Sequence, residues 1–321
     1  RRPVRKNILH SLLFLLPLTA LVVLLGPVFA PKNNTSAAGM LEADPIAILS
    51  QPENSIDLLF LGDSEAYSGF VPMALWQDYG IASFVCACVD QKPYETLEFL
   101  KTALRQQSPK AVVLETNVLY RVYSRMDLVE PTAQKLFPVL RYHDRWKSLS
   151  PRDLSAPEYT GAYPDRGYHL LTAADPLEDL TGYMAPMEEW EPLSKANRSS
   201  LQDLYNLCKE NDIQLILYSI PSPANWTVRR HNTMEDLSRE LGIPYLDGNL
   251  LDLGIDWQTD TYDRGDHLNY WGAVKVTRDL GRWFQENLPL PDHRGEASYE
   301  AWDRDLATLP DRIAAKQQEE R

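Results

Sequence analysis

Short apolar runs alternate with helix-like stretches between residues 55 and 290, and this order restricts the chain to a small set of folds. Strand-like runs occur at residues 56–61, 111–114 and 214–218, with a shorter one at 243–247. Helix-like stretches precede the last three, at residues 94–106, 201–211 and 233–241. Strands separated by helices are joined by parallel crossovers, and the helices then cover both faces of the sheet. The sequence therefore predicts an α/β fold, a three-layer α/β/α sandwich with a central parallel sheet.

The N-terminal segment has the pattern of a membrane anchor. Arg1, Arg2, Arg5 and Lys6 precede an apolar run at residues 8–30, which is long enough to cross a hydrocarbon core of about 30 Å. Basic residues on this side favour a cytoplasmic N-terminus. We expect a cytoplasmic stub and transmembrane helix over residues 1–30 of a single-pass cell-membrane protein, with the rest of the chain extracytoplasmic. A cleaved signal peptide is the alternative, although the apolar run exceeds the usual length of about 7 to 15 residues.

Changes in composition divide the remaining chain. Residues 31–54 are polar and lack periodicity, which predicts a stalk between the bilayer and the domain that follows. The main domain is expected over residues 55–290. Within it, residues 121–195 interrupt the alternation of strands and helices and contain many Pro, Tyr, Asp and Arg residues. That stretch is either an insertion over the carboxyl edge of the sheet or a set of ordinary surface loops. Residues 291–321 predict a charged helical tail.

The charge and the motif content exclude several classes of partner. The formal net charge is −13, and the clustered Lys and Arg that phosphate binding requires are missing, so nucleic acid is not an expected partner. No group of His, Cys and Asp has the spacing of a metal site, and no glycine-rich phosphate loop occurs. We therefore predict no metal ligands and no cofactor.

A candidate nucleophile follows the first predicted strand. Gly62-Asp63-Ser64 ends that strand sharply, and a serine on a tight turn before a helix exposes its hydroxyl as a nucleophile requires. The alternative is that Ser64 only caps the helix.

A candidate base lies near the other end of the domain. His267 stands in a polar turn directly before an amphipathic stretch at residues 274–285. A serine hydroxyl needs an imidazole to accept its proton, and the imidazole needs a carboxylate to fix its tautomer. Asp263 and Asp266 are both available. Positions four apart share a face in a helical turn, so we favour Asp263, and Asp266 stays the alternative. The simpler interpretation is that His267 only caps or packs near the start of a helix.

These two elements resemble the first and last motif blocks of the SGNH (GDSL-like) hydrolase superfamily, through residues 61–64 and 266–269. Within it, the chain is similar to the bacterial membrane-anchored branch that includes teichoic-acid D-alanyl transfer proteins and alginate-type O-acetyltransferase partners. The resemblance implies that Ser64 is the nucleophile and His267 its base. It also matches Asn117 with the asparagine that stabilises the oxyanion, and an asparagine that only stabilises the turn is the alternative. The expected second-block glycine has no counterpart, so a backbone N–H of Ala87 or Cys88 is expected to serve.

The last block departs from the superfamily pattern, because Arg264 occupies the position three before His267 where an aspartate is usual. The resemblance implies an extracytoplasmic serine O-acyltransferase that modifies a cell-envelope polysaccharide through an acyl-Ser64 intermediate, supplied with acyl groups by a multi-spanning membrane-bound O-acyltransferase. One alternative is an SGNH esterase or deacetylase of envelope glycans, which acts on an acyl ester substrate. A non-catalytic glycan-binding module is the other.

Overall fold

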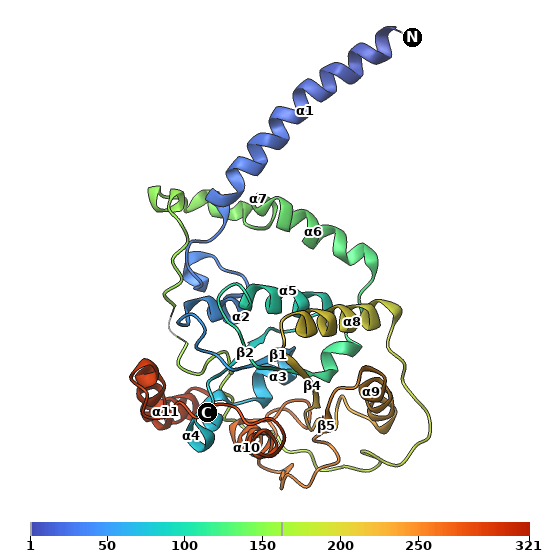
Figure 1. Ribbon diagram of the computed structural model, residues 1–321, viewed down its shortest axis with the longest axis vertical. Coiled ribbons are helices and arrows are strands. Elements are labelled where there is room, and N and C mark those ends of the chain that lie inside the picture. Colours follow the sequence, from blue (N-terminus) through green and yellow to red (C-terminus); the bar gives the residue numbers. More distant parts are fainter. Residues whose placement is uncertain (1, 162) are drawn as a thin grey trace. The chain divides into compact units, whose positions relative to one another are not determined.

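The computed structural model describes residues 2–161 and 163–321, apart from the side chains of residues 2–5 and 125. The chain forms two compact units (Figure 1). Unit 1 consists of Arg1–Ala43 and Ser124–Gly161, and unit 2 of Asp44–Tyr123 and Ala162–Arg321. The predicted insertion at residues 121–195 is thus divided between the two units.

Unit 2 is built around a parallel sheet in the order β2-β1-β3-β4-β5. Its strands are β1 (Leu58–Gly62), β2 (Ser83–Ala87), β3 (Ala111–Glu115), β4 (Gln214–Ser219) and β5 (Tyr245–Asp247). The four strands predicted from the sequence are present. β2 was not predicted, because its small residues Ser83, Cys86 and Ala87 give a weak strand pattern, although every residue of β2 is buried.

Helices cover both faces of this sheet. The helices of unit 2 are α2 (Ala43–Ile46), α3 (Ser64–Gly69), α4 (Pro72–Tyr79), α5 (Pro93–Ala103), α8 (Lys195–Glu210), α9 (Val228–Leu241), α10 (Tyr270–Asn287) and α11 (Glu300–Glu319). α5 and α8 contact each other, whereas α10 contacts α3 and α4 (Figure 1). The predicted three-layer α/β/α sandwich is therefore confirmed.

The two central strands form the middle of the core. Every residue of β1 and β3 is buried, which accounts for their continuous apolar runs. The core also reaches the C-terminal helix. Trp302 of α11 is buried, and its ring lies 4.5 Å from the guanidinium carbon of Arg166. Trp76 Nε1 donates to Asp303 Oδ1 at 2.9 Å. The charged tail is thus a packed helix of unit 2.

The segment predicted as a stalk is partly folded. Two 3-10 helices, η1 (Ser36–Ala38) and η2 (Ala47–Ser50), fall within residues 31–54. Ala47 and Ile48 are fully buried, and η2 contacts α5. The folded domain therefore begins before residue 55, because this short apolar stretch packs on the sheet's helical layer.

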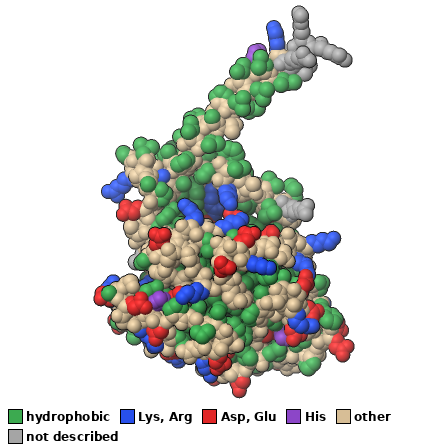
Figure 2. Space-filling model, in the orientation of Figure 1, with side chains coloured by type: hydrophobic (Ala, Val, Ile, Leu, Met, Phe, Trp, Pro, Cys, Tyr) green, Lys and Arg blue, Asp and Glu red, His purple; other side chains and the backbone are tan. Residues whose placement is uncertain are grey.

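Unit 1 contains α1 (Arg2–Phe29), α6 (Val129–Leu136) and α7 (Pro138–Arg141), with 3-10 turns η4 (Arg125–Leu128), η5 (His143–Lys147) and η6 (Pro151–Leu154). Lys6–Phe29 is long and apolar enough to cross a membrane, a property that a signal sequence near an N-terminus shares. Figure 2 shows its hydrophobic side chains on the surface. The side chains of Arg1, Arg2 and Arg5, on which the predicted orientation depends, lie outside the described residues.

Candidate active site

The carboxyl ends of β1 and β3 lie side by side at the point where the chain order of the sheet reverses. β1 pairs with β2 on one side and with β3 on the other. In open α/β sheets such a switch point leaves a crevice in which ligands bind. Ser64 follows β1 and Asn117 follows β3, so two of the predicted site residues flank this crevice.

Asp63, and not Ser64, caps the helix that follows β1. Asp63 Oδ1 accepts a hydrogen bond from the Glu65 backbone N–H at 3.1 Å. Ser64 is the first residue of α3, where a backbone N–H has no acceptor within the helix. Because Asp63 does the capping, the Ser64 hydroxyl is not required for it.

Gly62 allows α3 to start directly against the sheet. A Cβ atom at this position would lie 2.7 Å from Ala66 Cβ and 2.8 Å from Glu115 Cβ. Both distances are shorter than a carbon–carbon contact allows. The glycine of the Gly62-Asp63-Ser64 motif is therefore needed for the close approach of three elements, β1, α3 and the end of β3.

The side chain of Asp63 is anchored by an arginine that the sequence did not single out. Arg121 Nε forms a short ion pair with the buried Asp63 carboxylate, and Arg121 Nη1 lies 3.3 Å from Asp90 Oδ1. Burial raises the pKa of Asp63, and the Arg121 charge opposes this rise. Asp63 is thus a fixed structural group of the turn.

His267 is presented by a turn with left-handed backbone. Arg264 and Gly265 have φ values of 57° and 85°, and the Asp266 N–H donates to the Asp263 carbonyl at 3.3 Å. Two consecutive left-handed residues are typical of a mirror-image β-turn. The turn is therefore not helical. Asp263 reaches His267 because this tight turn folds the chain back on itself, not because the two residues share a helix face.

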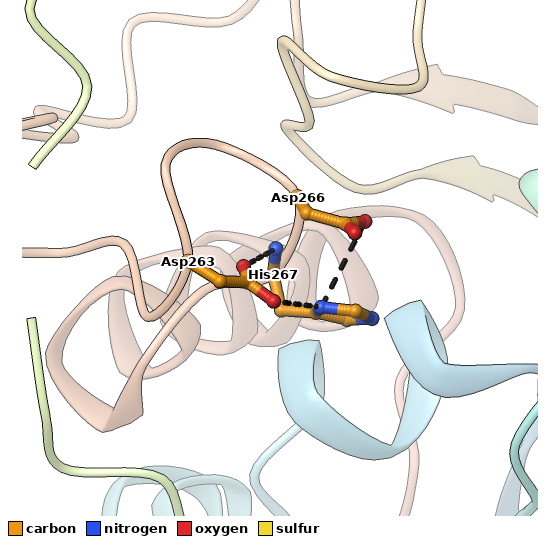
Figure 3. Close-up of side chains that lie close together, drawn as sticks. All are labelled: Asp263, Asp266 and His267. Atoms are coloured by element: carbon orange, nitrogen blue, oxygen red, sulfur yellow. Dashed lines mark hydrogen bonds and ion pairs between the residues drawn. The ribbon is translucent and has the colours of Figure 1, made fainter. Parts of the chain in front are cut away.

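Asp263 binds the imidazole of His267 on one side (Figure 3). Asp263 Oδ2 lies 2.7 Å from Nδ1, and Oδ1 accepts the His267 backbone N–H at 2.6 Å. Asp266 Oδ1 is 3.7 Å from Nδ1, too far for a hydrogen bond. On the other side of the ring, Nε2 is buried and has no hydrogen-bond partner among the described residues. The ring therefore has one nitrogen fixed by a carboxylate and one nitrogen free.

The charges around His267 favour its protonated form. Burial of the ring opposes the imidazolium, but the hydrogen bond to Asp263 and the charges of Asp266 and Asp63 outweigh it, so the pKa of His267 is raised. Burial also acts on Asp263, yet the hydrogen bonds from His267 prevail and lower the pKa of this carboxyl. The pair is thus suited to hold a proton taken up at Nε2.

Asn225 connects the start of α3 to the His267 turn. Asn225 Nδ2 lies 2.7 Å from Glu65 Oε1 and 2.5 Å from Asp266 Oδ1. Glu65 is the residue after Ser64, and Asp266 is the residue before His267. The turn is also held by Ser222 Oγ, which donates to the Asp266 carbonyl at 2.8 Å. Ser64 and His267, distant in the sequence, are therefore carried by two segments that a single amide bridges.

Asn117 lies at the same edge with a fixed orientation. Its Oδ1 accepts from Arg230 Nη1 at 3.0 Å, and its Nδ2 lies 3.5 Å from Asp63 Oδ2. The amide N–H groups are thus directed toward the turn that carries Ser64. By contrast, the Cys88 backbone N–H donates to Gln91 Oε1 at 3.0 Å and is already engaged.

Sequence reasoning missed Glu65, Arg121, Asn225 and Arg230. Glu65 directly follows the Gly62-Asp63-Ser64 motif, and its side chain is buried beside Asp63. Burial and the neighbouring carboxylates raise the pKa of Glu65 well above its ordinary range. The other three lie in loops or at a helix start, and no spacing rule connects them with Ser64. Their roles follow only from tertiary contacts.

An open cleft lies against the His267 turn. Its volume is about 320 Å³, and its lining includes Arg264, Tyr183, Met187 and Trp226. Trp226 is buried, and its Nε1 donates to Asp247 Oδ2 at 3.1 Å, yet one part of it borders this cleft.

Three potential metal donors meet at the turn. Ligand atoms of Asp263, Asp266 and His267 lie within 4.8 Å of one another. A cation bound through Nδ1 would displace the hydrogen bond that fixes the ring. The prediction of no metal ligands stays a prediction.

No family model and no curated protein matches the sequence. Solved structures with similarity to the chain include a psychrotrophic esterase from Pseudoalteromonas sp., at 12% identity and TM-score 0.41, covering 73% of this chain and 98% of that one. A lipase/acylhydrolase from Enterococcus faecalis has 10% identity and TM-score 0.38, covering 72% and 96%. A GDSL-like lipase from Bacteroides thetaiotaomicron has 14% identity and TM-score 0.36, covering 72% and 88%.

Proposed function

We propose that the chain is a serine enzyme of acyl transfer, with Ser64 as nucleophile, His267 as base and Asp263 as the acid that orients the base. The observation that carries this proposal is the state of the imidazole. Its Nδ1 is bound to Asp263, while its Nε2 is buried and without a hydrogen-bond partner among the described residues. An imidazole held in this way is suited to accept a proton from a hydroxyl.

The reaction follows from these roles. Ser64 Oγ attacks an acyl ester or thioester carbonyl and transfers its proton to His267 Nε2. The leaving oxygen or sulfur then takes that proton, which leaves an acyl-Ser64 ester. The developing oxyanion is stabilised by the Asn117 side-chain amide and by the backbone N–H of Ser64 at the start of α3. An acceptor hydroxyl next gives its proton to His267 and attacks the ester. His267 then passes that proton to the departing Ser64 Oγ, which releases the acylated acceptor and restores Ser64.

We further propose that the acceptor is a cell-envelope polysaccharide, and that α1 is a single-pass anchor with unit 2 on the extracytoplasmic side. An enzyme on that side has no cytosolic acyl-CoA, so the acyl group would come from a membrane partner of the multi-spanning O-acyltransferase type. The cleft beside the His267 turn supports an extended acceptor, because its lining includes aromatic rings, which stack on sugars.

The test is acylation of the purified full chain in detergent micelles by p-nitrophenyl acetate, with and without envelope-type oligosaccharides. Intact mass should show one acetyl adduct on the wild type and none on Ser64→Ala. Ser68→Ala is the matched control. Its hydroxyl lies one turn further along α3 and donates to the Ser64 carbonyl at 2.7 Å, so the adduct should persist.

The products decide between the alternatives. Acetylated oligosaccharide would support acyl transfer, whereas release of acetate alone in the presence of several acceptors would favour an esterase. Equal behaviour of the wild type and folded Ser64→Ala would refute the catalytic role of Ser64 and favour a binding module.

A further inference from the structure

α7 packs against the C-terminal end of α1 within unit 1. The two helices contact each other, and a Cβ atom at Gly26 would lie 2.9 Å from Pro138 Cδ. Gly26 therefore permits a close approach of the α7 start to α1. In Figure 1, α7 and α6 run away from the C-terminal end of α1.

The C-terminal carbonyls of α1 are bound by cations of the same unit. Arg145 Nη1 donates to the Phe29 carbonyl at 2.6 Å, and Lys32 Nζ donates to the Pro27 carbonyl at 2.8 Å. Arg145 is held in turn by Asp153, at 2.5 Å. These contacts satisfy carbonyls that a helix end leaves open and place positive charge at the negative end of the helix dipole. The segment after α6 is thus fixed to the end of α1.

α6 has a polar face whose side chains are bonded to one another. Gln134 Nε2 donates to Glu130 Oε1 at 2.8 Å, and Arg141 Nη1 donates to Gln134 Oε1 at 3.1 Å. Arg141 also forms an ion pair with Glu42. This face is therefore occupied by contacts within unit 1.

The other face of α6 is apolar and exposed. Val129 and Leu136 expose 60% and 64% of their surface, and Met126 just before α6 exposes 76%. Val129 and Leu136 border an open hollow of about 390 Å³, which is formed by Leu128, Val129, Thr132, Ala133, Leu136 and Phe137, and none of these described side chains is charged. Beyond α7, Trp146 is 64% exposed beside Lys147. Exposed apolar side chains in such a group mark an interaction surface.

The position of α7 along α1 determines how deep α7 would lie in a bilayer that α1 crosses. The 24-residue apolar segment Lys6–Phe29 is about 36 Å long, about 6 Å more than a hydrocarbon core of about 30 Å. A centred span would extend about 3 Å beyond the core at each end. Gly26 lies three residues, about 4.5 Å, before the end of α1. The contact between Gly26 and Pro138 therefore falls at the boundary between acyl chains and headgroups.

We propose that the segment 126–147 lies in the headgroup region of the bilayer that α1 crosses, with the apolar face of α6 on the acyl chains. This inference rests on α1 being a retained anchor. A helix with one polar and one apolar face binds a lipid surface in this way, and an exposed Trp next to basic residues is typical of the interfacial zone. The continuity with α1 is what selects lipid as the occupant.

The test measures the depth of nitroxide labels on the full chain in phosphatidylcholine vesicles that contain phosphatidylglycerol. Cysteines are introduced by Leu136→Cys and by Gln134→Cys, about 160° apart on α6, and by Leu16→Cys in α1 as a reference. The background carries Cys88→Ala. Cys86 and Cys208 are buried, and burial raises the pKa of both thiols, so they react slowly.

Collision rates with oxygen, which concentrates in lipid, and with a water-soluble nickel chelate give the depth. The oxygen-to-nickel ratio at Leu136→Cys should be several-fold higher than at Gln134→Cys and should approach the ratio at Leu16→Cys. Val129→Cys, on the same face as Leu136, should repeat this result.

Three other outcomes overturn the inference in different ways. Equal ratios at Leu136→Cys and Gln134→Cys, with a lipid-exposed Leu16→Cys, would show that α6 lies in water while the anchor holds. A label at Leu136→Cys that neither reagent reaches would show that protein covers this face, either a second copy or a partner. A nickel-accessible Leu16→Cys would refute the anchor itself.

Discussion

Replacing Asp263 by asparagine tests which carboxylate serves His267. Asparagine keeps nearly the same shape and can still accept the His267 backbone N–H, so the turn is expected to fold. The charge-assisted hydrogen bond of 2.7 Å to Nδ1 is lost. Such a bond contributes about 1.5–3 kcal/mol, which corresponds to about 10- to 150-fold in rate. The wrong tautomer adds to this loss, and in well-characterised serine triads the total reaches about 10⁴. We therefore expect kcat to fall by about 10² to 10⁴.

Asp266→Asn is the matched control. Asp266 Oδ1 lies 3.7 Å from Nδ1 and makes no hydrogen bond to the ring, so kcat should fall by less than about fivefold. Both variants remove a negative charge that raises the pKa of His267. In both, the pH–rate profile should therefore shift to lower pH.

The assay is the pH dependence of kcat/KM for a p-nitrophenyl ester. The base works when neutral, so wild-type activity should be lost as the pH falls through a value above the ordinary histidine pKa of about 6.5. An Asp266→Asn loss equal to or larger than the Asp263→Asn loss would refute the assignment of Asp263, and so would an unchanged inflection in Asp263→Asn.

Four further predictions concern the same site. Asn117→Ala should lower the single-turnover acylation rate by about 10²-fold with little change in KM, since an oxyanion donor acts mainly in the transition state. Gly62→Ala should reduce the free energy of unfolding by about 1–3 kcal/mol, measured by denaturant titration, because its Cβ atom has no room. Asn225→Leu should lower Tm and kcat together, since it leaves the Glu65 and Asp266 carboxylates without their shared donor. Excess EDTA should leave the acylation rate unchanged; a loss restored by a divalent cation would contradict the metal-free reaction.

The C-terminal helix offers a separate stability test. Trp302 of α11 is buried against Trp76 and Arg166, with its ring centroid 5.2 Å from that of Trp76. Trp302→Ala should therefore cost about 3–5 kcal/mol in the free energy of unfolding, which thermal or denaturant unfolding of the full chain will measure. Substitutions at exposed positions usually change the free energy of unfolding by less than about 0.5 kcal/mol. A change this small for Trp302→Ala would indicate that α11 is only loosely attached.

Local pattern determined the fold class and the two segments that carry the candidate site residues. The strands at residues 111–114 and 214–218 were predictable because strands buried on both faces must be apolar throughout. Gly62-Asp63-Ser64 and the turn before His267 were recognisable for the same local reason, since a strand end and a helix start leave signatures within a few residues. The hydrophobic length of α1 likewise depends only on consecutive residues.

Other features depended on the tertiary structure, because they involve contacts that the spacing of residues in the sequence does not determine. The choice of Asp263 over Asp266 as the Nδ1 partner depends on the left-handed φ values of Arg264 and Gly265, which no helical spacing rule anticipates. The bridge from Asn225 to the segments of Ser64 and His267 joins parts of the chain that are remote in sequence, so its energy depends on the completed packing. The proposed lipid contact of the apolar face of α6 also depends on tertiary structure, because it is inferred from the contact of α7 with α1.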